Sequence, residues 1–239
     1  MSQHSPLPNA YGLVKTTLLD YPGQVAAVVF VPGCNLRCPW CQNPGLVHAP
    51  WADDLLPRDD LLSFLAKRRN VLGGVVITGG EPLFHPGTEA LLAEVRALGY
   101  QIKLDTNGTL PRRLERLDPG LVDYVAMDLK NAPTRYAASA GLPVAANLLT
   151  DSLKLLAERW PGRSEVRLTW VPGLNRAQDL PEYASALQGL AANLPLWVQA
   201  YRPGAVLEVS MVNTRAPTEA ELAEVVSTLV QLGVDARLR

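Results

Sequence analysis

Residues 25–41 of the chain read Val-Ala-Ala-Val-Val-Phe-Val-Pro-Gly-Cys-Asn-Leu-Arg-Cys-Pro-Trp-Cys. The first seven form a continuous apolar run of strand length, the pattern of a strand buried on both faces of a parallel sheet. The loop that follows carries Cys34, Cys38 and Cys41, which are all the cysteines of the 239-residue sequence. A buried strand that leads into a loop with three thiols predicts an α/β fold with a site at the carboxyl end of its strands.

The three cysteines have C-x3-C-x2-C spacing, which is incomplete as a structural zinc site. Such a site has four closed ligands, and the fourth would have to come from His4, His48 or His85. A cubane iron–sulfur cluster also takes four ligands, but with three thiolates it keeps one iron open for another molecule. Zinc motifs normally pair their ligands two and two, so the spacing favours the cluster over a zinc staple.

The composition is that of an ordinary soluble globular protein. The apolar fraction is 48%, the charged fraction is 19% and the net charge is −1, so no electrostatic feature points to nucleic acid or to an anionic membrane. No apolar run reaches the 18 residues of a membrane span, and the polar start of the chain does not resemble a signal peptide. Clustered cysteines without a secretory signal predict the reducing cytoplasm.

The rest of the chain alternates strand and helix patterns. This alternation predicts a parallel sheet built from right-handed βαβ units. About six units are too few for a closed eightfold barrel, so we expect an open, partial (βα)6 barrel that resembles a TIM barrel. Strands are expected at 74–78, 100–104, 124–127, 166–171 and 196–201, and helices at 57–70, 88–98, 111–117, 147–160, 180–192 and 218–232.

The two ends of the chain extend this pattern. Residues 12–22 are expected to form a small hairpin or an edge strand, and a short strand is expected after the last helix. Thr218 followed by Glu221 is a capping box at the start of that helix. We therefore expect one domain over 1–239, with a leader or edge segment at 1–23, the core barrel at 24–205 and a terminal helix and strand at 206–239.

Polar residues stand directly after five of the expected strands. The carboxyl ends of parallel strands are where α/β folds place their active sites, so these residues are expected to converge on one cleft. They are Cys34 to Cys41, Glu81, Asp105 to Asn107, Asp128 to Lys130, and Arg202.

The cysteine loop resembles that of the radical S-adenosylmethionine (SAM) enzymes. Their signature is C-x3-C-x-aromatic-C, and Trp40 supplies the aromatic residue. The resemblance implies that Cys34, Cys38 and Cys41 hold a [4Fe–4S] cluster whose open iron binds S-adenosyl-L-methionine. The cofactors would then supply the radical chemistry, and the protein would bind and orient them.

Three later strand ends carry motifs of the same family. Gly79-Gly80-Glu81-Pro82 resembles the strand end that meets the SAM amino group, where glycines allow a close approach of the backbone. Asp105-Thr106-Asn107-Gly108 and Asp128-Leu129-Lys130 resemble motifs that line the SAM site in one branch, the glycyl-radical-enzyme activases. By the same resemblance, Asp105, Thr106 and Asp128 are candidates to hold a monovalent cation. If the resemblance is set aside, the first motif is a turn and the second a surface ion pair of Asp128 with Lys130. Arg167 either contacts the cofactor or faces outward.

The segment from Gly12 to Gly23, with the cysteine loop, most resembles the activating proteins of anaerobic ribonucleoside-triphosphate reductase and of pyruvate formate-lyase. The expected partners are a glycyl-radical enzyme, most of all that reductase, and a flavodoxin- or ferredoxin-type electron donor. The chain departs from the activase pattern twice. Gln42 stands where many activases have histidine, and Tyr201-Arg202 stands where the pyruvate formate-lyase activator has Tyr-His.

The expected function is reductive cleavage of S-adenosylmethionine to a 5′-deoxyadenosyl radical, which installs a glycyl radical on a partner enzyme. The first alternative is a radical SAM enzyme that acts on a small molecule, such as the deazapurine-forming synthases of similar size. The second is a non-enzymatic module stapled by a metal.

Overall fold

The computed structural model describes residues 9–47, 54–190 and 194–239. Two of the candidate zinc ligands, His4 and His48, lie outside these residues. The chain divides into two compact units, the first comprising Met1–Asn35, Gly45–Thr106 and Arg116–Val125, and the second comprising Leu36–Pro44, Asn107–Glu115 and Ala126–Arg239. Strand β6 (Tyr124–Asp128) begins in the first unit and ends in the second.

The first unit contains a sheet whose strands follow the order β3-β1-β2-β4-β5. Parallel pairs join β2 (Ala26–Val31) to β4 (Gly74–Gly79) and β4 to β5 (Gln101–Thr106). The edge is antiparallel, with β1 (Ala10–Thr17) pairing both β2 and the short β3 (Leu56–Pro57). A strand is therefore present where a small hairpin or edge strand was expected at 12–22, but it spans Ala10–Thr17, and the short β3 forms the edge of the sheet in its place.

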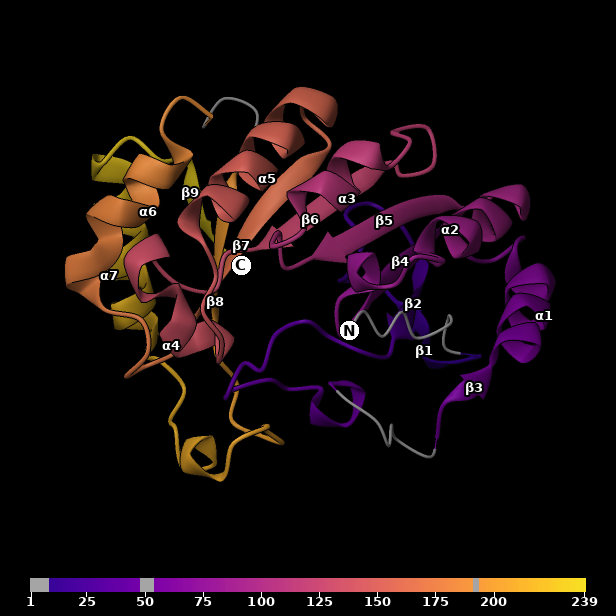
Figure 1. Ribbon diagram of the computed structural model, residues 1–239, viewed down its shortest axis with the longest axis horizontal. Helices are drawn as coiled ribbons and strands as arrows, with labels where there is room; N and C mark the ends of the chain where they lie inside the picture. The colour runs from indigo at the N-terminus through magenta and orange to yellow at the C-terminus, as the bar shows by residue number, and fades with distance from the viewer. Residues whose placement is uncertain (1–8, 48–53, 191–193) are drawn as a thin grey trace. The chain divides into compact units, whose positions relative to one another are not determined.

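Two helices of the first unit, α1 (Arg58–Arg68) and α2 (Thr88–Ala97), follow β3 and β4 in the chain (Figure 1). Each buries leucines, among them Leu61 and Leu65 of α1. The central strands β2 and β4 are largely buried, the pattern of inner strands in a parallel sheet.

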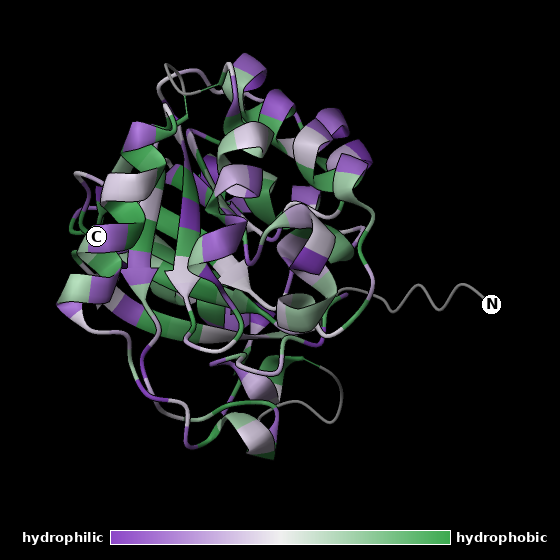
Figure 2. Ribbon diagram, turned by 90° about the vertical axis from the view of Figure 1, so that its left-hand side faces the viewer, coloured by the Kyte–Doolittle hydropathy of each residue, from purple (hydrophilic) through white to green (hydrophobic). Residues whose placement is uncertain are grey.

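The second unit contains the parallel strands β7 (Ser164–Trp170), β8 (Leu196–Ala200) and β9 (Ala236–Leu238) in that order. Its longer helices are α5 (Ala146–Arg159), α6 (Leu180–Leu187) and α7 (Glu219–Gln231). Each of the three buries hydrophobic residues at helical spacing and has polar residues between them, and the ribbons of Figure 2 are banded accordingly. The short helices α3 (Pro111–Arg116) and α4 (Tyr136–Ala140) complete it.

The capping box expected at Thr218 and Glu221 is present. The Thr218 hydroxyl accepts from the Glu221 backbone at 3.2 Å, and the Glu221 carboxylate accepts from the Thr218 backbone at 2.7 Å. The final strand is confirmed as β9. The helix expected at 180–192 was predicted too long, because it ends at Leu187, just before Gly189 adopts a left-handed φ of 77°.

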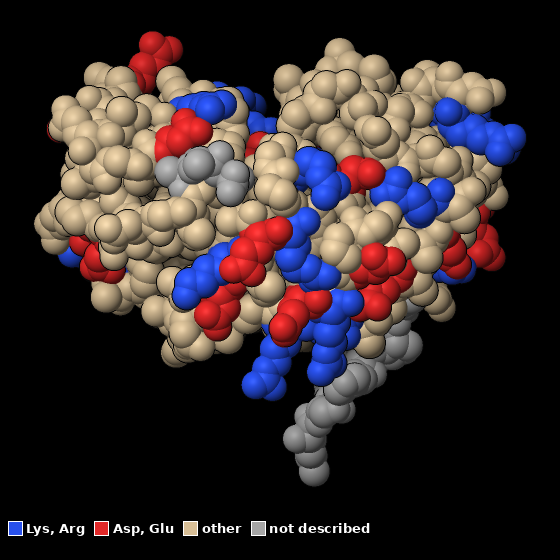
Figure 3. All heavy atoms as spheres, turned by 90° about the horizontal axis from the view of Figure 1, so that it is seen from above, with Lys and Arg blue, Asp and Glu red and all other residues tan. Residues whose placement is uncertain are grey.

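The other expected helices and strands lie within a few residues of their predicted places, but β3, α4 and the 3₁₀ turns were not predicted. These turns are Pro44–Leu46, Pro82–Phe84, Pro133–Arg135, Ala177–Asp179 and Val209–Met211. In the part of the chain that the structure describes, no helix is long and apolar enough to cross a membrane. On the face seen in Figure 3, basic and acidic side chains are interspersed, in agreement with the small net charge.

Candidate active site

The first half of the cysteine loop is fixed by backbone hydrogen bonds within the first unit. The Cys34 amide donates to the Val47 carbonyl at 3.2 Å, and the Gly33 amide donates to Leu46 at 2.6 Å. The Gly33 carbonyl accepts from the Glu81 amide at 2.9 Å. The G-G-E-P strand end is therefore joined directly to the residue before the first cysteine.

Glycine is required at this junction by the closeness of two backbones. A Cβ on Gly80 would overlap the Gly33 carbonyl oxygen, and a Cβ on Gly33 would lie 2.6 Å from Nε2 of the buried His85. Gly33 also has a left-handed φ of 94°. His85 contacts the Pro32 carbonyl through Nε2 at 2.5 Å, and burial lowers the pKa of its ring.

The Glu81 side chain is completely buried and hydrogen-bonded inside the first unit. Its Oε1 accepts from the Leu83 backbone at 3.0 Å and from the Thr106 hydroxyl at 2.9 Å. The first bond caps the 3₁₀ turn that starts at Pro82. Glu81 thus joins the end of β4 to the end of β5, a structural role that the motif alone did not reveal.

Asp105 has a cationic neighbour on its own strand. The Lys103 ammonium lies 2.7 Å from Asp105 Oδ1, and the lysine side chain is completely buried. A buried ammonium is stable only when it is paired, so this pair places a fixed positive charge beside the carboxylate expected to hold a monovalent cation. Lys103 was not among the predicted residues, although an internal lysine in a buried strand is the signal that would have identified it.

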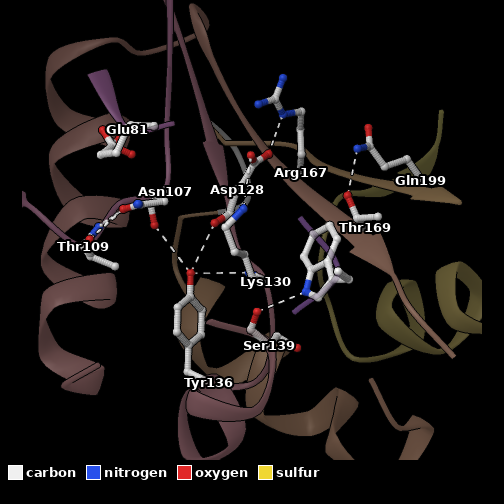
Figure 4. Close-up of polar contacts among 12 residues, drawn as sticks. Glu81, Asn107, Thr109, Asp128, Lys130, Tyr136, Ser139, Arg167, Thr169 and Gln199 are labelled. Atoms are coloured by element: carbon white, nitrogen blue, oxygen red, sulfur yellow. Dashed lines mark hydrogen bonds and ion pairs between the residues drawn. The ribbon is translucent and has the colours of Figure 1, made fainter. Parts of the chain in front are cut away.

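In the second unit, Asp128 is the centre of a charged group at the end of β6 (Figure 4). Its Oδ1 lies 2.8 Å from Nε of Arg167, and its Oδ2 lies 3.6 Å from the Lys130 ammonium. The Lys130 ammonium also lies 5.2 Å from the centre of the Trp40 ring, a cation–π contact. The Arg167 guanidinium therefore binds Asp128, and its side chain is largely buried at the end of β6.

Cys38 and Cys41 belong to the second unit, where they close a tight turn. The Cys41 amide donates to the Cys38 carbonyl at 3.0 Å. Burial raises the pKa of the Cys38 thiol to about 11, against the opposing effect of Lys130. All three cysteines are free thiols, with Cys38 buried and Cys34 and Cys41 partly exposed. Three free thiols in one loop are the donor set that an iron–sulfur cluster requires.

Asn107 and Gly108, which were also predicted from the sequence, form the turn after β5. The Asn107 amide oxygen accepts from both the backbone and the hydroxyl of Thr109, at 3.0 and 2.6 Å, so this side chain forms a turn. Gly108 has a left-handed φ of 72°, and a Cβ there would overlap the Met127 side chain. Among the described residues, no three His, Cys, Asp or Glu side chains are gathered around a point where a single metal ion would sit.

Several polar residues of the second unit were not predicted at all. Figure 4 shows the Tyr136 hydroxyl pointing at the turns after β5 and β6, 3.5 Å from the Asn107 carbonyl and 3.3 Å from the Asp128 carbonyl. The Gln199 amide donates to the Thr169 hydroxyl at 2.9 Å between β8 and β7. The short helix α4 supplies Tyr136 and Ser139, and its residues carry no motif that a sequence reading could have used.

The sequence model of the Radical SAM superfamily matches residues 28–187 of this chain, which is more than half of it. The chain belongs to the radical SAM superfamily. The family uses a [4Fe–4S] cluster and S-adenosylmethionine, so the expected cofactors are confirmed at the level of the family, and the protein is a radical SAM enzyme.

Two relatives indicate different branches of the superfamily. A Methanocaldococcus jannaschii protein, provisionally assigned as a glycyl-radical enzyme activating enzyme, is 25% identical over 222 residues, which cover 89% of this chain and 88% of that protein. A 7-carboxy-7-deazaguanine synthase of Rhodospirillum rubrum is 34% identical over 163 residues, which cover 64% of this chain and 66% of the synthase.

Solved structures confirm the fold, an α/β radical SAM core with a partial barrel. A domain of a pyruvate-formate lyase-activating enzyme from Bacteroides vulgatus has a TM-score of 0.55 at 21% identity, covering 70% of this chain and 99% of that domain. QueE from Escherichia coli has a TM-score of 0.58 at 17% identity, covering 98% and 93%. SuiB from Streptococcus suis, solved bound to S-adenosylmethionine, has a TM-score of 0.61 at 15% identity; the match covers 89% of this chain but about half, 51%, of SuiB.

Proposed function

We propose that this radical SAM enzyme is a glycyl-radical-enzyme activating enzyme. Cys34, Cys38 and Cys41 would hold the cluster, and the partner would be a glycyl-radical enzyme such as an anaerobic ribonucleoside-triphosphate reductase. The observation that carries the proposal is the match to the provisional activating enzyme of M. jannaschii, because it extends over almost the full length of both chains. We place the reaction in the cytoplasm, with a flavodoxin- or ferredoxin-type protein as electron donor.

When bound, the cluster and S-adenosylmethionine would supply the radical chemistry that removes a hydrogen atom from the partner's glycine. The protein residues then have three roles. The thiolates of the cysteine loop bind the cluster. Trp40 and the strand-end groups bind and orient S-adenosylmethionine, and these groups are Gly79, Gly80, Glu81, Pro82, Asp105, Thr106, Asn107, Asp128 and Lys130. The buried surroundings of Cys38 exclude water from the ligand.

A small-molecule reaction is the second candidate, and one observation favours it. The deazaguanine synthase of R. rubrum has the higher identity, 34%, although over a shorter part of the chain. An enzyme of that kind would need polar groups dedicated to its substrate. Thr169 and Gln199, which are hydrogen-bonded to each other at 2.9 Å, are the unassigned pair that such a reaction would use.

Anaerobic reconstitution distinguishes the candidates. The protein is loaded with iron and sulfide, reduced with dithionite and mixed with S-adenosylmethionine. Both candidates predict about four irons per chain and formation of 5′-deoxyadenosine. A glycyl radical signal in the electron paramagnetic resonance spectrum of an added ribonucleotide reductase supports the first. Formation of 7-carboxy-7-deazaguanine from the substrate of those synthases, without a glycyl radical, supports the second.

The assignment of the cysteines as cluster ligands is tested with two variants. Cys38→Ala should abolish both cluster binding and cleavage of S-adenosylmethionine, because a cluster held by two thiolates of this loop is incomplete. Ser210→Ala, an exposed substitution in the 3₁₀ turn Val209–Met211, is the control and should retain both. Full iron content in Cys38→Ala would contradict the assignment, and zinc in place of iron in the wild type would contradict both candidate functions.

A further inference from the structure

The short helix α4 (Tyr136–Ala140) lies against the cysteine loop within the second unit. Its last two residues accept hydrogen bonds from that loop: the Ala140 carbonyl from the Arg37 amide at 2.9 Å, and the Ser139 carbonyl from the Trp40 indole at 3.1 Å. Gly141, the residue that ends the helix, packs so closely that a Cβ would overlap the Arg37 carbonyl oxygen. Three consecutive residues therefore contact the segment that carries Cys38.

Helix α4 is itself fixed by a buried polar network. The Ser139 hydroxyl accepts from the Asn131 side-chain amide at 2.9 Å, and the Asn131 amide oxygen accepts from the Tyr183 hydroxyl at 3.0 Å. The Tyr183 hydroxyl in turn accepts from the Asn175 amide at 2.9 Å. All four side chains are at least nine-tenths buried. A fully hydrogen-bonded buried network is rigid, because breaking any bond leaves a polar group without a partner in a dry environment.

The contacts join the cysteine loop to the turns after two strands. Asn131 follows the Asp128-Leu129-Lys130 motif directly, and Asn175 lies in the turn after β7. The Asn175 amide also donates to the Lys130 carbonyl at 3.2 Å, and its oxygen accepts from the Val171 amide at 2.7 Å. The path from Asn175 to Arg37 thus consists of buried hydrogen bonds and one tight backbone contact.

We propose that residues Ser139 to Gly141 are positioning residues that hold the Cys38–Cys41 half of the cysteine loop in its cluster-binding conformation before the cluster arrives. The inference rests on the proposed assignment of the cysteines as ligands. A free loop would lose backbone entropy at each residue when the cluster binds. A loop already held by Arg37 and Trp40 has lost that entropy on folding, so the thiolates bind iron with higher affinity.

The test compares two glycines with the same backbone conformation. Gly141 has a φ of 71° and a backbone neighbour at the Cβ position, whereas Gly162 has a φ of 69° and nothing within 4 Å. Alanine carries the same left-handed penalty at either position, but only Gly141→Ala forces the cysteine loop away. Iron bound per chain is measured for the wild type and both variants against the concentration of iron supplied during anaerobic reconstitution, with a melting curve to verify that each is folded.

We expect wild type and Gly162→Ala to bind about four irons per chain. Gly141→Ala should have an iron affinity lower by about 10- to 100-fold, the effect typical of losing a group that orients a metal ligand. Wild-type iron content and affinity in Gly141→Ala would overturn the inference. Absence of a cluster in the wild type would instead overturn the proposed function, so the two failures are distinguishable.

A second measurement on the cluster-free protein covers the case in which Gly141→Ala does not fold. Hydrogen exchange of the peptide that contains residues 36–41 should be slow in the wild type, because the Arg37 amide is bonded to Ala140. Ser139→Ala removes the Oγ acceptor of Asn131, keeps the backbone carbonyl, and should make exchange of this peptide faster. Exchange as fast as that of an unprotected loop in the wild type, or no change in Ser139→Ala, would overturn the inference.

Discussion

The side-chain amide of Gln42 donates a hydrogen bond to the backbone carbonyl of Arg202 at 2.7 Å. The two positions at which the chain departs from the activase pattern are thus in contact, although they are 160 residues apart in the sequence. A second bond, from the Glu208 amide to the Pro39 carbonyl at 2.9 Å, joins the same two segments. Two hydrogen bonds therefore hold the segment after β8 against the cysteine loop: one is donated by the loop and the other is accepted by it.

Replacing Gln42 should loosen the segment after β8. In Gln42→Glu the side chain keeps its size but cannot donate to the Arg202 carbonyl, so hydrogen exchange of residues 203–210 should become faster. The change should correspond to about 0.5–1.5 kcal/mol, the net contribution of one hydrogen bond. Gln178→Glu, an exposed substitution elsewhere in the same unit, is the control. Unchanged exchange in Gln42→Glu would mean that the Glu208 bond alone fixes the segment.

The pair of Asp128 and Arg167 should show measurable coupling in a double-mutant cycle. Their side chains are 32% and 13% exposed, so the ion pair is neither fully solvated nor fully buried. We expect a coupling free energy of about 1–2 kcal/mol from urea unfolding of Asp128→Asn, Arg167→Met and the double variant. The exposed pair of Asp235 and Arg237 is the control and should give less than about 1 kcal/mol. Equal coupling in the two pairs would contradict a partly buried ion pair at Asp128.

Removing the buried ammonium of Lys103 should destabilise the protein strongly. Lys103→Met leaves the Asp105 carboxylate, 8% exposed, without this charge partner at 2.7 Å, at an expected cost of about 3–5 kcal/mol in the free energy of unfolding. Adding Asp105→Asn removes the uncompensated charge and should recover much of that loss. Urea unfolding at pH 7 measures both variants, and a double variant no more stable than Lys103→Met would contradict the ion-pair argument.

The ion pair of Lys103 and Asp105 also leads to a prediction about monovalent cations. Because the Lys103 ammonium already balances Asp105, the free energy of unfolding of the cluster-free wild type should not change when sodium chloride is replaced by choline chloride at equal ionic strength. A clear loss of stability in choline chloride would support a metal cation at Asp105 in addition to the lysine. This comparison therefore tests the cation expected from the sequence.

The sequence predicted the strands and the residues after them because both depend on short-range patterns. The apolar runs that became β2 and β4 are unbroken, and glycine or proline follows each one. The sequence could not predict helix α4, because five residues make little more than one turn and show no countable periodicity. It also could not predict that Glu81 accepts from Thr106 or that Gln42 donates to Arg202, since such contacts depend on how distant segments are brought together.

The start of α7 should depend on pH. The hydrogen bond from Arg215, then the one from the Thr218 backbone, lowers the pKa of Glu221 from its ordinary value of 4.5 to about 2. A carboxyl whose pKa is lower in the folded state stabilises the protein above pH 4.5, and the stabilisation is lost as the pH falls from 4.5 to about 2. The difference in melting temperature between wild type and Glu221→Gln should therefore shrink over this range, and a difference that stays constant from pH 5 to about 2 would contradict the argument.

Removing the hydroxyl of Tyr136 should lower the free energy of unfolding, whereas removing that of Tyr201 should not. The Tyr136 hydroxyl lies 3.3 Å from the Asp128 carbonyl, whereas the Tyr201 hydroxyl has no hydrogen-bond partner among the described residues. Both side chains are at most 1% exposed. Tyr136→Phe should lower the free energy of unfolding by about 1 kcal/mol, and Tyr201→Phe should leave it unchanged or raise it by up to about 1 kcal/mol.

Urea unfolding of the cluster-free protein measures both effects, and each variant is the control for the other because the substitution is chemically identical. A loss of stability in Tyr201→Phe as large as that in Tyr136→Phe would contradict an unpaired hydroxyl. The affinity for S-adenosylmethionine in the reconstituted protein adds a separate readout. It should fall in Tyr136→Phe, because that hydroxyl holds the backbone of Asp128 and Lys130, and it should be retained in Tyr201→Phe.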